Sequence, residues 1–443
     1  MSSAKNRFYV LMWSEIEKWT STASLLRFPN ITKDWELERV GNLLNQITKK
    51  HKVEGDVYYR LAGVRGKGGG VFHRETVKGK ELSASWLQPL MPGALIYNRL
   101  FAWKESFAIV PEEHANHFVS NEFPQFVVNK RKAIPEYLYL VFIGKKVIRA
   151  VNAASIGSSA VSRNRFKEED FLNFTIPLPS VPTQQKIVHY WKSAQDNISV
   201  ANKHFFKLIS NLNQSLIQNT CAYRKLKNSK VFVASYSKAQ QWDVKAGRSA
   251  AFRTANPDFV RLGEFTEECT ELVRPWEKPD KEWPIYGVNN KDGVFLNAYQ
   301  KGKAFNAPYK RIEKNWFFHN PTRANVGSLG IIPEVPEDAI TSPEYQVWRL
   351  HSGFLPDFVA LMIRTEYFLS LVDFNRVGGV KQRMYYANLA EIRLPMIDLE
   401  IQKTFADQRV AILSSITKAN ESVKDRRAEI EEMILGLRPV EGI

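Results

Sequence analysis

The sequence is poor in the residues that build disulfide frameworks and metal sites, and it has no long apolar run. Of its 443 residues, two are cysteines, Cys221 and Cys269, and eight are histidines. Two cysteines give neither a disulfide framework nor a structural zinc site. No apolar stretch approaches the ~20 residues that a membrane-spanning helix needs, and the first residues lack the apolar core and cleavage site of a signal peptide. We therefore expect a cytoplasmic protein without a metal centre.

Motifs for catalysis are also missing. "GVRGKGGG" (63–70) has the glycines of a phosphate-binding loop but lacks the Gly-Lys-[Ser/Thr] ending, so it predicts a turn. "NAPY" (306–309) is close to the Asn-Pro-Pro-Tyr loop with which adenine methyltransferases hold a flipped base. Its second residue is Ala, however, and no Gly-rich cofactor loop follows a strand. No Pro-Asp is followed at nuclease spacing by Glu-x-Lys. The sequence therefore predicts a chain with no catalytic site and no cofactor of its own.

Charge is the first positive indication of function. Lys and Arg outnumber Asp and Glu by 62 to 46, which gives a formal net charge of +16. Such an excess favours a polyanionic partner, most often nucleic acid, over a merely basic soluble protein. The excess is local, because residues 224–253 hold eight basic residues and a single acid, Asp243, whereas residues 400–437 hold six basic and seven acidic residues.

The chain repeats itself at an offset of 222 residues. "NRLFAWKESFAIVPE" (98–112) corresponds to "NPTRANVGSLGIIPE" (320–334), and eight identities fall within 25 positions without a gap. Matching segments lie in the same order on either side of this stretch: 10–19 with 233–242, 39–41 with 261–263, 63–72 with 287–295, and 176–184 with 394–402. The chain is therefore predicted to be a tandem duplication of one unit.

Each repeat ends in a long helical pattern. Apolar residues at a/d spacing extend over about five heptads, which predicts two helices of roughly 55 Å that pack on each other through narrow seams. The alternative is that each helix lies only on its own globular domain. The first seam comprises Ile187, Trp191, Ala194, Ile198, Ala201, Phe205, Leu208 and Leu212, followed by the polar Ser215 and Asn219. The second comprises Phe405, Ile412, Ile416, Ala419, Val423, Ile430, Met433 and Leu437, with Arg409 and Arg426 interrupting it and Gly436 and Pro439 at its end.

The rest of each repeat mixes short β-like runs with helical patterns. Runs such as "GALIYN" (93–98) and "NWFFHN" (315–320) lie between Gly, Pro and Asn breaks and indicate strands. Residues 135–151 and 356–372 look helical and are equivalent to each other. The expected fold class is α+β.

On these residues the chain resembles the specificity subunits of type I restriction–modification enzymes. The resemblance rests on "IPLP" (176–179) with Gln184, on "LP" (394–395) with Gln402, and on the doubled order of a variable domain and a long helix. "VP" (181–182) departs from the acidic residues usual after the first motif. The resemblance implies two pseudo-symmetric globular target-recognition domains separated by two long antiparallel coiled-coil helices. The implied domains are 1–182 with a lead-in at 1–34, a helix at 183–226, 227–399 with a basic lead-in at 227–256, and a helix at 400–443.

The resemblance also implies function and partners. Each recognition domain would read one half of a bipartite DNA target, and the helices would set the spacing between the halves. The implied partners are double-stranded DNA, two methyltransferase (modification) subunits docked on the helices, and usually two motor-nuclease (restriction) subunits. S-adenosylmethionine, ATP and Mg are expected on those subunits, and none in this non-catalytic chain. A scaffold or inhibitor built on the same frame is the alternative, and it would bind proteins tightly without preferring a DNA sequence.

Side chains that differ within the matching frame are the candidates for DNA contact. Arg and Lys suit guanine, Asn and Gln suit adenine, and phosphate needs only positive charge. In the first repeat the candidates are Arg65, Lys67, Arg74, Arg99, Lys104, Arg163 and Arg165. In the second they are Asn289, Asn290, Lys291, Lys310, Arg311, Arg323 and Arg383. Lys67 and Lys291 occupy equivalent positions and are expected to bind phosphates, as are the three arginines that precede the long helices, Arg163, Arg165 and Arg383.

Overall fold

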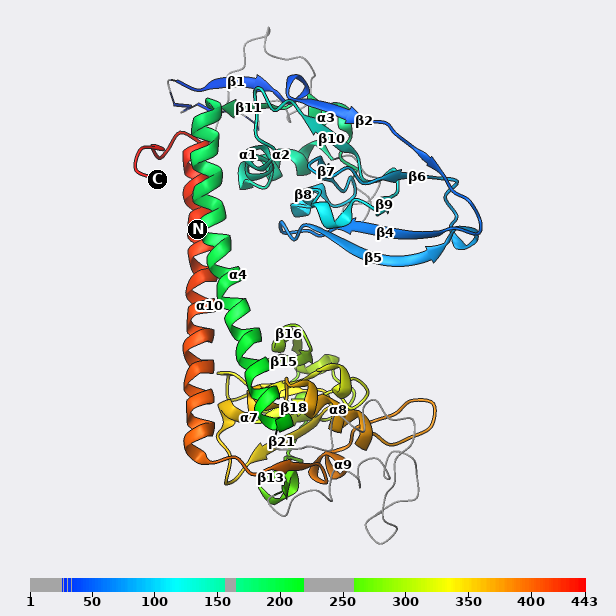
Figure 1. Ribbon diagram of the computed structural model, residues 1–443, viewed down its shortest axis with the longest axis vertical. Helices are drawn as coiled ribbons and strands as arrows, with labels where there is room; N and C mark the ends of the chain where they lie inside the picture. Colours follow the sequence, from blue (N-terminus) through cyan, green and yellow to red (C-terminus); the bar gives the residue numbers. More distant parts are fainter. Residues whose placement is uncertain (1–25, 27, 30, 33, 156–164, 219–258) are drawn as a thin grey trace. The chain divides into compact units, whose positions relative to one another are not determined.

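The computed structural model describes residues 26–443 apart from residues 27, 30, 33, 156–164 and 219–258 (Figure 1). The chain divides into two compact units, Met1–Asn197 with Ala419–Ile443, and Ile198–Lys418. The two long helices, α4 (Val181–Gln218) and α10 (Leu399–Ile434), each contribute one half to either unit. The predicted first helix extends to residue 226, and the part from residue 219 lies outside the described residues.

The described part of the first unit contains three sheets. Their strand orders are β1-β11, β2-β10-β7-β8 and β3-β6-β9-β4-β5. All pairings are antiparallel except β4 with β9, which run parallel. The strands are β1 (Glu36–Arg39), β2 (Leu44–Ile47), β3 (His51–Lys52), β4 (Tyr58–Val64), β5 (Val71–Lys78), β6 (Trp86–Pro89), β7 (Leu95–Tyr97), β8 (Phe107–Ile109), β9 (Phe118–Val119), β10 (Gln125–Val128) and β11 (Thr175–Leu178).

The second unit repeats this topology strand for strand. Its orders are β12-β22, β13-β21-β18-β19 and β14-β17-β20-β15-β16, again with one parallel pair, β15 with β20. Because the non-local pairings recur in the same order, the duplication predicted from the sequence is a duplication of the fold. The strands are β12 (Phe259–Arg261), β13 (Thr266–Glu268), β14 (Leu272–Val273), β15 (Glu282–Asn289), β16 (Gly293–Lys301), β17 (Tyr309–Arg311), β18 (Phe317–His319), β19 (Leu329–Ile331), β20 (Ile340–Thr341), β21 (Gln346–Leu350) and β22 (Arg393–Pro395).

Two helices stand where the sequence predicts a single helical segment in each unit. The break falls at Gly144 in the first unit and at Thr365 in the second, and both residues have extended backbone before the next helix. The Thr365 hydroxyl caps that helix by accepting a hydrogen bond from the Phe368 N–H at 3.2 Å. The apolar pattern continues across both breaks, so it could not reveal them. The helices are α1 (Pro135–Phe142), α2 (Lys145–Ala154), α3 (Glu168–Leu172), α7 (Pro356–Met362), α8 (Glu366–Asn375) and α9 (Tyr386–Ala390).

Aromatic side chains fill the core between the four-stranded sheet and the helices of each unit. In the first unit the ring of Phe171 lies 5.1 Å from that of Tyr97 and 5.4 Å from that of Phe126, centroid to centroid. In the second, the rings of Phe317 and Trp348 stack at 4.5 Å. Burying one such side chain stabilises a fold by about 2–3 kcal/mol. These cores therefore hold the strand ends and turns of each unit in fixed positions.

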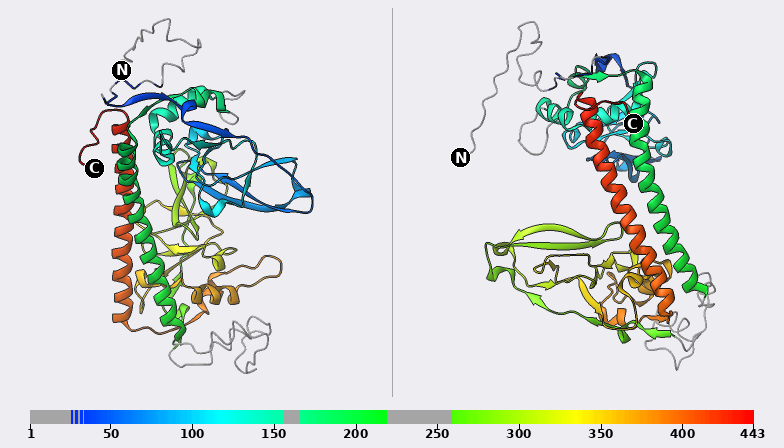
Figure 2. Two further views of the ribbon diagram at one scale, coloured as in Figure 1. Left: turned by 45° about the horizontal axis from the view of Figure 1, so that its top comes forward. Right: turned by 90° about the vertical axis from the view of Figure 1, so that its left-hand side faces the viewer.

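In each unit the halves of α4 and α10 run side by side in opposite directions, as the apolar seams predict (Figure 2). The predicted packing of the two helices on each other is thereby confirmed. In the same units both halves also pack against the globular core, so the helices serve both contacts. The predicted seam residues are all buried or half-buried: Ile187, Trp191, Ile198, Phe205, Leu208, Leu212, Phe405, Ile412, Ile416, Val423 and Ile430.

The ends of both seams differ from the prediction. Leu437 is 61% exposed, because α10 ends at Ile434 and Gly436 (φ +69°) turns the chain there. The N–H of Leu437 then bonds back to the carbonyl of Glu432 at 2.9 Å, a common helix-ending turn. At the end of α4, Leu216 is buried where the seam was expected to continue in Ser215, and Asn219 lies outside the described residues.

The two arginines that interrupt the second seam have specific partners. The guanidinium of Arg426 donates to the carbonyl of Tyr190 at 2.7 Å and lies 4.4 Å from the centre of that ring. Arg409 forms an ion pair with Asp357 at the start of α7. Each arginine therefore ties α10 to another element of its unit instead of weakening the helix packing.

Candidate nucleic-acid interface

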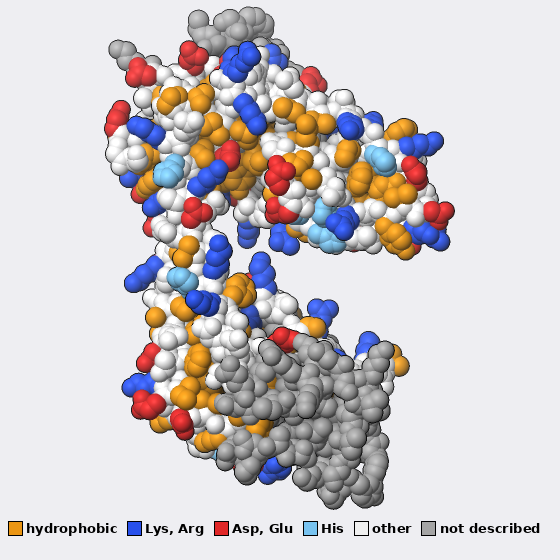
Figure 3. All heavy atoms as spheres, viewed as in Figure 1, with side chains coloured by type: hydrophobic (Ala, Val, Ile, Leu, Met, Phe, Trp, Pro, Cys, Tyr) orange, Lys and Arg blue, Asp and Glu red, His pale blue; other side chains and the backbone are white. Residues whose placement is uncertain are grey.

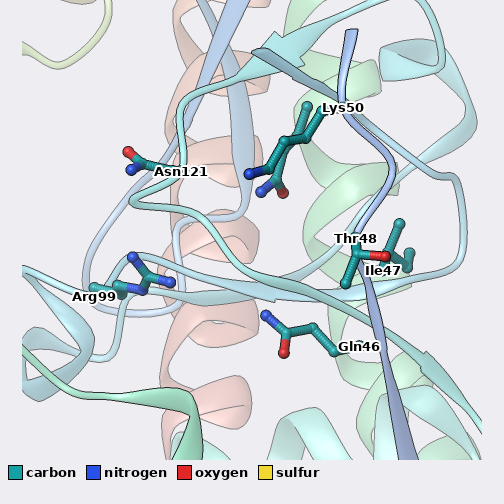
Figure 4. A pocket seen from close by; sticks show the side chains of 7 residues that line it. Gln46, Ile47, Thr48, Lys50, Arg99 and Asn121 are labelled. Atoms are coloured by element: carbon teal, nitrogen blue, oxygen red, sulfur yellow. The ribbon is translucent and has the colours of Figure 1, made fainter. Parts of the chain in front are cut away.

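A surface pocket of about 520 Å³ in the first unit is lined mainly by amide and cationic side chains (Figure 4). Its wall comes from the end of β2, from β6, and from the turns after β7 and before β10. Asn and Gln pair with adenine edges, and Arg and Lys with guanine, so the pocket has the chemistry of base reading. The lining residues are Gln46, Ile47, Thr48, Lys50, Gln88, Arg99 and Asn121.

Acidic residues hold Arg99 in place. Its guanidinium forms an ion pair with Glu168, and the amide of Gln46 donates to the same carboxylate at 3.3 Å. Burial is the largest single effect and disfavours the charged guanidinium, but the hydrogen bond to Glu168 and the nearby negative charges together outweigh it and raise the pKa of Arg99. Arg99 is thus a fixed cation, and Figure 4 shows its polar end turned toward that of Gln46.

Some polar atoms of the pocket are not used within the unit. Gln88 Oε1 and Arg99 Nε have no hydrogen-bond partner among the described residues. Both atoms are buried, and leaving a buried donor or acceptor without a partner is unfavourable.

The equivalent positions in the second unit carry different chemistry. Strand register makes Lys310 the counterpart of Gln88, because Gln88 pairs with Val119 as Lys310 pairs with Thr341. Glu268 similarly replaces Gln46. Burial lowers the pKa of Lys310, and the nearby Glu268 opposes this shift. The counterparts of the pocket residues are Glu268, Cys269, Thr270, Leu272, Lys310, Pro321 and Pro343.

Three predicted cations of the first unit meet at the β4–β5 turn. This turn lies within the "GVRGKGGG" segment, after the end of β4 at Val64, so the prediction of a turn is confirmed. The N–H of Lys67 donates to the carbonyl of Lys104 at 2.7 Å. The Arg65 guanidinium lies 4.5 Å from the Phe72 ring centre, and the Lys104 ammonium lies 4.6 Å from the Trp103 ring centre. Aromatic faces thus steady two of the cations while Lys67 stays exposed.

The β15–β16 turn is the counterpart in the second unit. The Asn289 side chain accepts hydrogen bonds from the N–H groups of Lys291 at 2.8 Å and of Asp292 at 2.6 Å, so it shapes the turn. The Asn290 carbonyl accepts from Arg364 at 2.7 Å. Lys291 is exposed at the tip, as Lys67 is in the first unit.

The other predicted cations do not gather in one place. Three form ion pairs: Arg74 with Glu75 at 3.1 Å, Arg165 with Glu122 at 2.7 Å, and Arg311 with Glu271 at 3.1 Å and with Glu313 at 2.8 Å. On the face shown in Figure 3, Lys and Arg side chains of the first unit accordingly intermix with acidic and hydrophobic ones.

The last three candidates lie near turns or outside the described residues. Arg323 directly precedes the turn Ala324–Val326 and is exposed. A side-chain hydrogen bond to Tyr385 raises the pKa of Arg383, whose backbone also bridges to Val377. Arg163 lies outside the described residues.

Sequence reasoning missed the amide residues of the pocket, Gln46, Gln88 and Asn121. They come from three segments in which the two repeats align without a gap, but at these positions the second repeat has a different residue. The rule that selected Asn289 and Asn290 in the second repeat would have found them if it had also been applied to the uncharged positions of the first repeat.

Within the described residues, no group of three or more His, Cys, Asp or Glu could hold a metal ion. In the same part of the chain, every helix is too short or too polar to cross a membrane.

Comparison with known proteins places the chain beside restriction–modification proteins. Residues 100–205 match the family model described as the type I restriction modification DNA specificity domain. No curated protein sequence matches the chain. Three solved structures are similar over most of their length.

The first is the HsdS subunit from Thermoanaerobacter tengcongensis (14% identity, TM-score 0.35, 92% of this chain and 98% of that one). The second is the type I restriction-modification S subunit from M. genitalium (12%, TM-score 0.40, 94% and 98%). The third comes from work on the complex assembly and conformational transition of the type I R-M system (13%, TM-score 0.36, 92% and 97%). The family match confirms the resemblance seen in the sequence: the chain is similar to the DNA specificity subunits of type I restriction–modification systems.

Proposed function

We propose that this chain is the sequence-recognition subunit of a type I restriction–modification complex and that each unit reads one half of a bipartite DNA target. The observation that carries this proposal is that both units share one strand topology but have different side chains at equivalent positions. The pocket positions hold amides and Arg99 in the first unit, and Glu268 and Lys310 in the second. Two domains with the same fold but different side chains at the DNA-contacting positions suit the recognition of two different short base sequences.

The long helices give the target its fixed spacing in this proposal. Two halves held by continuous helices on one chain would recognise sites separated by a set number of base pairs, as half-site spacing follows protein geometry in dimeric DNA-binding proteins. Lys67 and Lys291, exposed at equivalent turns, are the proposed phosphate contacts.

The chain would carry no catalytic residue of its own. Two modification subunits docked on the helices would bind S-adenosylmethionine and methylate adenine, and restriction subunits would supply ATP- and Mg-dependent cleavage. Such a complex would work in the cytoplasm, where it meets DNA.

The test is methylation mapping of the host genome with and without the gene for this chain. The proposal predicts that an interrupted, adenine-methylated motif disappears on deletion. If the methylation pattern is unchanged and the purified complex shows no sequence preference on DNA, the chain instead serves as a scaffold or inhibitor.

A further inference from the structure

The second unit has a larger pocket, whose lining includes Asn290 and Lys291 among the candidate DNA contacts. Its volume is about 830 Å³, and it lies between α4, α10, α7 and the β15–β16 turn. Phe206 and Val326, both in its wall, are 68% and 54% exposed. Arg364 and Arg409 line it as well. A large hollow that combines exposed apolar side chains with guanidinium groups is suited to a protein partner.

The corresponding space can be identified in the first unit because both units grip the helices in the same way. In the first unit, Glu431 of α10 accepts a hydrogen bond from the Lys146 N–H at 3.2 Å, at the start of α2. In the second, Asn213 of α4 accepts one from the Tyr367 N–H at 2.9 Å, at the start of α8. The C-terminal part of α10 in the first unit is therefore equivalent to the C-terminal part of α4 in the second.

In the first unit the equivalent space is filled by the chain itself. Arg427 donates to the Glu105 carboxylate at 2.8 Å and to the carbonyl of Ile143 at 2.7 Å. The Tyr139 hydroxyl donates to the carbonyl of Gly68 at 3.2 Å. A ring and a carboxylate thus close the hollow next to the hairpin turn.

In the second unit each of these side chains is replaced by one that cannot fill the space. Gly327 stands for Glu105, Ala360 for Tyr139 and Ile209 for Arg427, and all three line the open pocket. Glu105 has φ +60° and Gly327 has φ +89°, so the backbone at this position is left-handed in both units. The second unit therefore keeps the backbone of this region but lacks the three side chains that fill the space in the first unit. We call those side chains, Glu105, Tyr139 and Arg427, the plug.

The charges around the pocket leave one guanidinium without an acid. Arg409 pairs with Asp357, and Lys314 pairs with Glu334. Arg364 bonds only to the carbonyl of Asn290 among the contacts described. Burial and the neighbouring Arg409 lower the pKa of Arg364, which a carboxylate brought by a partner would reverse.

We propose that this pocket receives an aromatic side chain and a neighbouring carboxylate from one modification subunit, in place of the plug that the first unit supplies internally. The inference rests on the proposed function. Because the first unit fills the equivalent space with its own side chains, two identical modification subunits would bind this chain with different affinities, and the copy at the second unit would bind more tightly.

The experiment is a calorimetric titration of the full chain with the cognate modification subunit, with stoichiometry read by native mass spectrometry. The plugged variant combines Ile209→Arg, Gly327→Glu and Ala360→Tyr, which transfers the side chains of the first unit. Arg364→Met removes the spare charge without filling the pocket. Leu296→Tyr, at an exposed position on β16 outside the pocket, is the matched control.

The wild-type chain is expected to bind two copies with unequal affinities. The plugged variant and Arg364→Met should each weaken the tighter site at least tenfold, while Leu296→Tyr leaves both sites unchanged. Two equal sites in the wild type, or unaltered binding in Arg364→Met and a folded plugged variant, would overturn the inference and leave the proposed function standing. A wild-type chain that binds no modification subunit would contradict both.

Discussion

The side chain of Gln184 accepts a hydrogen bond from the N–H of Ile134 at 2.8 Å and so ties the start of α4 to the start of α1. Its amide also donates to the carbonyls of Lys132 and Pro179, both at 2.9 Å. Gln402 makes the same three contacts in the second unit, beginning with the N–H of Leu355 at 2.9 Å. The repeated glutamine of the sequence is therefore a buried clamp between the long helix and the globular domain.

Replacing this clamp should destabilise the first unit. Gln184→Leu leaves one N–H and two carbonyl groups without a partner in a buried place, and the expected loss is about 3 kcal/mol in the free energy of unfolding. Urea unfolding followed by tryptophan fluorescence measures it. Gln185→Leu, the same change at the adjacent exposed position, is the control and should cost less than about 0.5 kcal/mol. Equal effects of the two substitutions would show that the clamp contributes nothing.

The stability of the second unit should fall at mildly acidic pH because of His319. Burial lowers the pKa of this imidazole to about 4, despite the hydrogen bond to the carbonyl of Met384. In the unfolded chain the pKa of histidine is about 6.5. Below that pH the unfolded state therefore binds a proton that the folded state does not bind. The resulting destabilisation of the folded state is absent above pH 6.5 and grows as the pH falls toward 4.

At pH 5 the expected destabilisation relative to pH 7 is about 2 kcal/mol from this residue. Unfolding free energies of the wild type and of His319→Gln at both pH values measure it, since Gln keeps a donor for Met384 but does not titrate. A variant with the same pH dependence as the wild type would contradict this assignment.

The amide pocket of the first unit should determine part of the DNA preference. Gln88→Leu removes an amide from the lining of the pocket and should reduce discrimination at one base pair of one half-site by about 1–3 kcal/mol. Lys310→Met, at the equivalent position, should affect only the other half-site. Competition binding of the complex with the modification subunit to single-base variants of its target distinguishes the two. Loss of preference in both halves from either change would refute the separate reading of the halves.

The hairpin-tip lysines should act on affinity without affecting sequence preference. Lys67→Ala and Lys291→Ala should each weaken binding to all sequences alike and reduce the slope of log K against log salt by about 1. Lys281→Ala is the control, because Lys281 is engaged with Asp338 at 2.8 Å. A change in preferred sequence, or an unchanged slope, would exclude a phosphate contact.

The sequence predicts the duplication, the α+β class and the paired helices because periodicity and spacing are local signals. The contacts of Gln184 and Gln402 show what such local signals cannot predict. The spacing from Pro177 to Gln184 recurs from Pro395 to Gln402. Two of the three partners of each glutamine nevertheless lie about 50 residues earlier in the chain, and only the fold brings them together.

The same limit applies to the candidate DNA contacts. In the sequence Arg311 is a candidate DNA contact, but the fold places its guanidinium in ion pairs with Glu271 and Glu313. Nothing in the sequence singles out Gln88, but the fold places it in a pocket beside Gln46, Arg99 and Asn121. Residue type indicates what a side chain could recognise, and tertiary pairing decides which side chains remain available to do so.

The modular reading is tested most directly by replacing residues 257–398 with the equivalent segment of another specificity subunit and mapping adenine methylation across the genome. The segment begins two residues before β12 and ends at the residue before α10, so the helices proposed to set the spacing are not replaced. The predicted result is a new motif in which one half and the spacer length are those of the wild type and the other half is changed. A change in both halves, or in neither, would contradict it.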